Sequence, residues 1–328
     1  MHLHGSARVR DPAMDRLRGL AVVLMLFANL APYLAPAPPP FWYRALATSC
    51  APGFVLLAGL MVGLHRPTLA AAIRRGIALV AVGALLDVTA WGIAPFRSFD
   101  VLYLIGVSMP VLALAGRVAP WLTLALASIV FLVTPLAQEA WGHAADLRGL
   151  ELVLHSAMLG GWFPLLPWLA VGAIGTALGA ADVVDERHAV TRLAGWGTLL
   201  LLAGAAVWHV TDPALSTRGG YAELFYPPTF AVLGTFTGLV LLALAALKSW
   251  PTLPMTLLER FGRHSLLVYA LHVLLIAHVI APLSLERGWR VAGLGFAFLL
   301  ASTALALGMI AGVPRRLGSG AHPVERRA

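Results

Sequence analysis

The chain has 328 residues, of which 59% are hydrophobic and 12% are charged, and its mean hydropathy is +0.83. The charged share is about half of that in soluble domains. A soluble fold could not bury so much apolar surface, so a lipid bilayer is the expected partner. The net charge of +8 does not indicate a nucleic-acid partner, because the basic residues lie between apolar runs, as topology signals do.

Ten apolar runs of roughly 17–23 residues, the length that crosses a bilayer, follow one another along the chain. They predict an all-α, polytopic integral membrane helix bundle with about ten transmembrane helices. A cytoplasmic N-terminal tail (1–14) precedes the single transmembrane domain (15–312), and a basic cytoplasmic tail (313–328) follows it. The runs cover residues 16–35, 46–64, 74–93, 100–115, 119–136, 159–180, 193–211, 227–247, 262–282 and 291–312.

The lysines and arginines predict the orientation of the bundle, since cytoplasmic loops are enriched in them. With the N-terminus inside, 17 of the 23 basic residues fall in cytoplasmic segments and six in outside loops. An even number of helices then places both termini in the cytoplasm, and the inner (plasma) membrane is the expected location. No clear cleavage site follows the first run, so it is expected to remain as an anchor. The outside segment 144–157 is predicted to form an amphipathic surface helix.

Polar side chains inside apolar runs are the best pointers to function, because a buried polar group is costly in lipid. Arg18 and Asn29 lie 11 residues apart in the first run. This spacing places them about 20° apart around a helix and about 16 Å apart along it, so they form one polar stripe. The stripe is either functional, or it consists of a positive-inside anchor at Arg18 and a helix-packing hydrogen bond at Asn29.

Three other groups interrupt the apolar runs. Asp87 lies in the third run, where it is either a functional carboxylate or the partner of a base in the outer loop. Asp100 begins the fourth run and is either functional or a helix N-cap. In the ninth run Ser265, Tyr269 and His272 share one helix face, which serves either catalysis or hydrogen bonding between helices.

Histidines near the outer surface are candidates for a general base, since histidine titrates near neutral pH. His143 and His155 are two such histidines, and an ordinary interface role is the alternative for each. No zinc spacing, phosphate-binding loop or nucleophile elbow is present, and no metal is expected. The single cysteine, Cys50, excludes an intrachain disulfide and is expected to be a small buried residue.

Five segments carry further motifs, and their order is informative. They are DRLRGLAVVLMLFAN (15–29), CAPGFVLLAG (50–59), FDVLYLIGVS (99–108), WFPLLPWLAVGAIGTALG (162–179) and FGRHSLLVYALHVLLI (261–276). In this order they resemble the heparan-alpha-glucosaminide N-acetyltransferase family, whose first helix carries an arginine-glycine pair followed by an asparagine or histidine at the same spacing. The proline-tryptophan segment is similar to that of bacterial members. The resemblance covers about residues 15–280.

The resemblance implies a transmembrane acyltransferase. It would take an acyl group from cytoplasmic acetyl-CoA, or another acyl-CoA, and pass it to a sugar or envelope glycan on the far side. A homodimer is left open. The residues expected in catalysis are Asn29, His143, His155 and His272. The residues expected to bind the donor, whose phosphates favour arginine, are Arg18, Arg74, Arg75, Arg117, Arg260 and Arg263. The residues expected at the substrate are Asp87, Asp100, Trp168 and Tyr269.

One position departs from the family pattern. Characterised members carry a catalytic histidine in the first outer loop, whereas residues 30–49 contain no histidine. Asn29 matches the family's asparagine but cannot act as a base. Either His155 or His143 takes over this role, or the protein transfers nothing and serves as a binding or scaffold protein. A transporter for a small anionic or lipidic substrate is a third alternative, because ionisable groups lie inside apolar runs.

Overall fold

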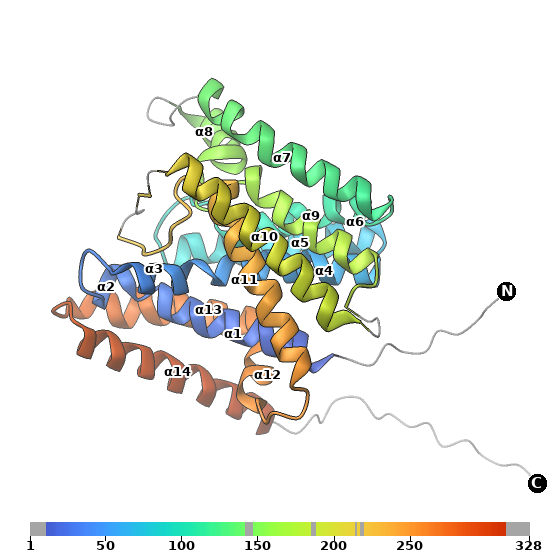
Figure 1. Ribbon diagram of the computed structural model, residues 1–328. Coiled ribbons are helices and arrows are strands. Elements are labelled where there is room, and N and C mark those ends of the chain that lie inside the picture. Colours follow the sequence, from blue (N-terminus) through green and yellow to red (C-terminus); the bar gives the residue numbers. More distant parts are fainter. Residues whose placement is uncertain (1–10, 142–146, 185–187, 214, 217–219, 313–328) are drawn as a thin grey trace, which may run out of the picture.

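The computed structural model describes residues 11–141, 147–184, 188–213, 215–216 and 220–312, and every regular element among them is a helix (Figure 1). The helices are α1 Pro12–Ala28, α2 Ala31–Leu34, α3 Phe41–Thr48, α4 Cys50–His65, α5 Leu69–Thr89, α6 Val101–Ala115, α7 Pro120–Trp141, α8 Gly149–His155, α9 Leu165–Ala180, α10 Ala189–Thr211, α11 Phe230–Ser249, α12 Thr256–Arg263, α13 Ser265–Leu275 and α14 Trp289–Gly312. Short π-helical turns follow α8 at Ser156–Gly160 and α13 at Ile276–Ile280.

Eight of the described helical stretches are long and apolar enough to cross a bilayer. A bent pair, Gly149–Gly160 with Leu165–Ala180, meets at 48° and raises the number to nine if it is one span. The apolar helix α6 is shorter. Each apolar run of the sequence contains a helix, so the prediction of a polytopic helical membrane protein is confirmed. The eight stretches are Pro12–Leu34, Phe41–His65, Leu69–Thr89, Pro120–Trp141, Ala189–Thr211, Phe230–Ser249, Ser265–Leu283 and Trp289–Met309.

The segment predicted as a surface helix is part of this bent pair. The structure has a helix over Gly149–His155, which continues into the π-helical turn and then bends into α9. Leu150 and Leu154 are exposed on it, whereas His155 is buried. Residues 142–146, and with them the candidate base His143, lie outside the described part of the chain.

Helices α4 and α9 approach so closely that only glycine fits between them. A Cβ atom on Gly59 would lie 1.9 Å from the carbonyl oxygen of Gly172, and one on Gly175 would lie 2.2 Å from that of Leu56. The Thr176 hydroxyl donates a hydrogen bond to the Gly59 carbonyl at 3.1 Å. Small residues at four-residue spacing, here Gly59 with Gly63, are the usual way in which membrane helices pack backbone against backbone.

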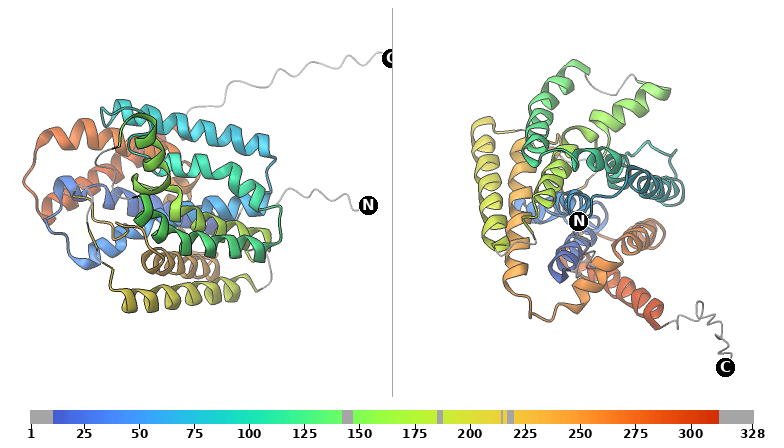
Figure 2. Two further views of the ribbon diagram at one scale, coloured as in Figure 1. Left: turned by 90° about the horizontal axis from the view of Figure 1, so that it is seen from above. Right: turned by 90° about the vertical axis from the view of Figure 1, so that its right-hand side faces the viewer.

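Other helices lie at the rim of the bundle and present apolar side chains outward. Figure 2 shows α10 and α14 on the periphery. In the most apolar 18-residue stretch of each helix, 17% of the residues of α10 and 22% of those of α14 are buried, compared with 67% for α11. Val210 is 83% exposed and Met309 is 71% exposed, which is the exposure expected of lipid-facing residues.

Charged contacts join the start of α1 to the segment between α11 and α12. The Arg16 guanidinium donates to Glu259 at 2.8 Å and to the carbonyls of Trp250 and Pro251 at 3.1 and 3.0 Å. The Lys248 ammonium lies 2.5 Å from the Asp11 carboxylate. The start of α1 and the end of α14 lie at the same end of the bundle (Figure 1). Arg16 is therefore a structural arginine.

Candidate functional site

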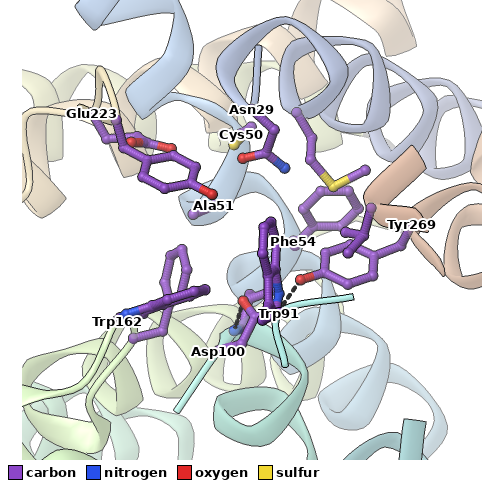
Figure 3. Close-up of a pocket in the computed structure, with 14 residues that line it drawn as sticks. Asn29, Cys50, Ala51, Phe54, Trp91, Asp100, Trp162, Glu223 and Tyr269 are labelled. Atoms are coloured by element: carbon purple, nitrogen blue, oxygen red, sulfur yellow. Dashed lines mark hydrogen bonds between the residues drawn. The ribbon is translucent and has the colours of Figure 1, made fainter. Parts of the chain in front are cut away.

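A polar cavity lies where the C-terminal end of α1 meets the start of α4, the start of α6 and the loops that carry Trp162 and Glu223. Its volume is about 40 Å³, enough for a few water molecules. The polar groups that line it include Asn29, Asp100, Glu223 and Tyr269, and Figure 3 shows these side chains around one shared space. Residues far apart in the sequence thus build one site, which we call the polar cavity.

Asn29 enters the polar cavity from the C-cap of α1 and is held by His272 of α13. The Asn29 amide nitrogen lies 2.8 Å from His272 Nε2, and His272 Nδ1 lies 3.2 Å from the carbonyl oxygen of Val268. A carbonyl only accepts, so Nδ1 carries the proton and Nε2 accepts from the Asn29 amide. The second amide hydrogen and the carbonyl oxygen of Asn29 remain for a ligand. His272 is completely buried, so this neutral pair is a fixed part of the bundle.

Asp100 and Tyr269 form the second polar pair of the cavity. The Tyr269 hydroxyl donates to one oxygen of the Asp100 carboxylate (Figure 3). The other Asp100 oxygen accepts from the Val101 amide at 2.5 Å, which makes Asp100 the N-cap of α6. The N-cap role foreseen for Asp100 is therefore present, and the same carboxylate also lines the cavity. The Asp100 carboxylate is therefore held in a fixed position on the wall of the cavity.

Asp87 has a different surrounding and does not line the polar cavity. It is 1% exposed, and its carboxylate accepts from the hydroxyls of Ser98 at 2.7 Å and Tyr103 at 2.8 Å. The same segment is held by backbone hydrogen bonds from Trp162 to Ser98 and from Phe163 to Phe99, at 2.8 and 2.9 Å. Asp87 thus fixes the loop that leads to Asp100, and its partners include a hydroxyl from that loop and one from α6.

A second, largely apolar cavity of about 290 Å³ begins beside Arg18 and Ser265. It runs along apolar side chains of α4, α5 and α6, such as Met61 and Leu79. Phe54, Val101 and Tyr269 line both cavities, so these three residues form the boundary between the two spaces. We call this space the apolar cavity. Arg18 and Asn29 form one predicted stripe on the first helix, but Arg18 lines the apolar cavity and Asn29 lines the polar cavity.

Several predicted site residues do not line either cavity. His155 is buried beside Trp141, with ring centres 5.4 Å apart, and is absent from the cavity walls. Trp168 is completely buried against Phe163 and Phe225. The remaining candidate arginines are exposed on the start of α5, the turn after α6, and α12: Arg74, Arg75, Arg117, Arg260 and Arg263.

The polar cavity also contains residues that sequence reasoning did not assign to a functional site. Glu223, Tyr221 and Trp162 come from loops, Trp91 follows the end of α5, and Cys50 begins α4. Trp91 and Trp162 meet edge to face at 5.9 Å, and Trp162 and Tyr221 lie 6.3 Å apart. For Tyr221, the aromatic content of the loop predicted to lie outside was the available signal. Among the described residues, no group of three or more His, Cys, Asp or Glu side chains is placed to hold a metal.

Comparison with known protein families gives a match over more than half of the chain. A family described as heparan-alpha-glucosaminide N-acetyltransferase, catalytic, matches residues 10–205. No curated protein matches the chain with significance. The matched region is more than half of the chain and includes Asn29 and Asp100, whereas Glu223, Tyr269 and His272 lie beyond it. The chain therefore belongs to the heparan-alpha-glucosaminide N-acetyltransferase catalytic family, as its motifs predict.

Proposed function

We propose that this membrane protein transfers an acyl group, most simply acetyl, from a cytoplasmic acyl-CoA to a saccharide or envelope glycan on the other side of the inner membrane. The observation that carries this proposal is the pair of cavities that meet at Phe54, Val101 and Tyr269. One space has apolar walls with Arg18 among its lining residues, and the other has aromatic and apolar walls that carry an amide and two carboxylates. A donor and an acceptor of different chemistry need such a pair of sites.

The apolar cavity suits the donor. Arg18 lines this cavity. Its side chain is 22% exposed, and its guanidinium lies 3.5 Å from the Asp15 carboxylate. Arginine binds phosphate oxygens in two-pronged geometry. The exposed Arg74, Arg75, Arg260 and Arg263 are further candidates for the phosphates of coenzyme A. The thioester would then lie near Tyr269, where the two cavities meet.

The polar cavity suits a sugar acceptor. It combines aromatic surfaces, including Trp91 and Trp162, with the carboxylates of Asp100 and Glu223. A few well-placed polar groups among apolar walls are typical of small-molecule sites, because the polar groups set orientation. In the present cavity of about 40 Å³ a sugar ring does not fit, so acceptor binding requires the walls of this cavity to move apart.

Asn29 is proposed to hold the thioester carbonyl or the attacking group of the acceptor. Its amide hydrogen not used by His272 can donate to the carbonyl oxygen as negative charge develops there. Its carbonyl oxygen can accept from the nucleophile. Either contact would be stronger in the transition state than in the ground state, which is the condition for a catalytic effect.

The deciding experiment combines binding and turnover in purified protein. Calorimetry with acetyl-CoA, with dephospho-coenzyme A as the control, should give saturable binding that weakens in Arg18→Ala. Labelled acetyl-CoA with glucosamine as the probe acceptor should give an acetylated product. A folded protein that binds no acyl-CoA would refute the proposal and favour the scaffold alternative. Movement of a solute into proteoliposomes with no covalent change would favour the transporter instead.

A further inference from the structure

Acyl transfer from a thioester needs a group that takes a proton from the attacking hydroxyl or amine. The described residues that line the polar cavity include two carboxylates, Asp100 and Glu223, and no histidine. His272 does not line the cavity, and its two ring nitrogens are engaged by Asn29 and by the Val268 carbonyl. His155 lies outside the cavity walls. Among the carboxylates and histidines, the choice of a base within this space is therefore between Asp100 and Glu223.

The two carboxylates are not equivalent in position. Both line the polar cavity and neither lines the apolar one, and the guanidinium of Arg44 interacts electrostatically with Glu223. Asp100 lies beside Val101 and Tyr269, both of which line the polar and the apolar cavity. Asp100 therefore lies at the boundary where a thioester from one side and a nucleophile from the other would meet. Its exposed fraction of 7% keeps most bulk water from it.

We infer that Asp100 is the general base of the transfer, in an inference that rests on the proposed function. The Asp100 carboxylate accepts the proton of the acceptor hydroxyl or amine while that oxygen or nitrogen attacks the thioester carbonyl carbon. The new carbon–oxygen or carbon–nitrogen bond forms, and the carbon–sulfur bond breaks. The proton then passes from Asp100 to the departing thiolate, so that free coenzyme A thiol and the acetylated acceptor are the products.

Tyr269 and the α6 N-terminus hold this carboxylate in place. The Tyr269 hydroxyl binds one oxygen of Asp100 and the Val101 amide binds the other, so the carboxylate cannot rotate away from the boundary. Both contacts stabilise the ionised form, which is the form a base requires. Glu223, at the far side of the cavity, is assigned to acceptor binding.

The test is Asp100→Asn, because asparagine keeps the N-cap of α6 but has no basic oxygen pair. Labelled acetyl-CoA and glucosamine are the probes, and calorimetric binding of acetyl-CoA reports on folding. We expect kcat to fall about 100-fold or more, the usual contribution of a general base. The KM for acetyl-CoA should stay within about threefold, as for a group that acts in the transition state. Asp100→Glu should recover part of kcat.

Two further variants make the outcome specific. Glu223→Gln should raise the KM for glucosamine and leave kcat largely intact. Asp212→Asn, an exposed substitution of the same kind at the end of α10, is the matched control for Asp100→Asn. A kcat within a few fold of wild type in Asp100→Asn, or a larger loss in Glu223→Gln than in Asp100→Asn, would overturn this inference alone. Wild-type protein that binds acetyl-CoA but transfers nothing to any acceptor would overturn the proposed function and this inference with it.

Discussion

Asn29 is oriented by a residue that lies 243 positions away in the sequence. The hydrogen bond from its amide to His272 Nε2 decides which way the amide faces, because His272 Nδ1 is already bonded to a backbone carbonyl. The carbonyl oxygen and the second amide hydrogen then face the polar cavity. A single contact between α1 and α13 thus determines which hydrogen-bonding groups a substrate meets.

Replacement of Asn29 by alanine should abolish most transfer without loss of the fold. Loss of one hydrogen-bond donor aimed at a developing negative charge costs about 10²–10³ in kcat. Binding of acetyl-CoA should remain near the wild-type level, because the donor's phosphates bind elsewhere. Turnover with labelled acetyl-CoA measures the first quantity and calorimetry the second. Unchanged turnover in Asn29→Ala would show that Asn29 takes no part in the transfer.

His272 should act through Asn29 as a positioning residue. In His272→Gln the side-chain oxygen can still accept from the Asn29 amide, whereas in His272→Leu it cannot. We expect kcat to fall about tenfold or more in the leucine variant, as positioning errors usually cause, and to recover in the glutamine variant. Equal losses in both variants, together with equally lowered melting temperatures, would point to packing alone.

At the level of the elements, the loop between α5 and α6 depends on Asp87. Removal of this carboxylate leaves the hydroxyls of Ser98 and Tyr103 without their acceptor in a buried place. Each buried polar group without a partner costs about 1–3 kcal/mol. Asp87→Ala should therefore lower the melting temperature in detergent more than Tyr103→Phe does.

The double variant Asp87→Ala with Tyr103→Phe tests whether the contact itself is responsible. It should be more stable than the sum of the single losses suggests, because both partners of one hydrogen bond are then removed. Strictly additive losses would show that the two residues are not coupled through this bond.

The close contact between α4 and α9 can be tested by its effect on stability. A methyl group or more at Gly175 would enter the backbone of α4, with the Leu56 carbonyl oxygen only 2.2 Å from the added Cβ. Gly175→Val should separate the helices and destabilise the protein by about 1–3 kcal/mol or more, as overpacking does. Gly195→Ala on α10 is the control, since nothing lies within 4 Å of its added Cβ. Equal melting temperatures for both variants would contradict this packing.

For the whole molecule, the predicted orientation follows from charge rather than from packing. With both termini cytoplasmic, cysteines placed at Ser6 or Ser319 in a Cys50→Ala background should react with a membrane-impermeant maleimide only after the membrane is opened. A cysteine at Thr217, in a predicted outside loop, should react in intact cells. Labelling of the two terminal positions in intact cells would show that the orientation is the reverse of the predicted one. Arg18 would then lie on the wrong side for a cytoplasmic donor.

The helical membrane fold follows from the sequence because the bilayer imposes a length on each apolar run. Helical periodicity also places Arg18 and Asn29 on one face of α1, and in the structure both face cavities of the bundle interior. The N-cap at Asp100 could be read from its position at the start of an apolar run. These features depend on neighbours in the sequence and on the surrounding lipid.

The partners of those residues depend on tertiary structure. Periodicity says which face of a helix is polar, but in a membrane almost every other face is apolar and offers no signal of what will lie opposite. Only the folded chain brings Tyr269 to Asp100 across 169 residues, and Glu223 from a loop into the same cavity. His155, which is a reasonable base by sequence, lies outside that cavity, because the bend between α8 and α9 buries it beside Trp141. The sequence therefore determines the bundle and one polar stripe, and the packing of the helices decides which groups share a site.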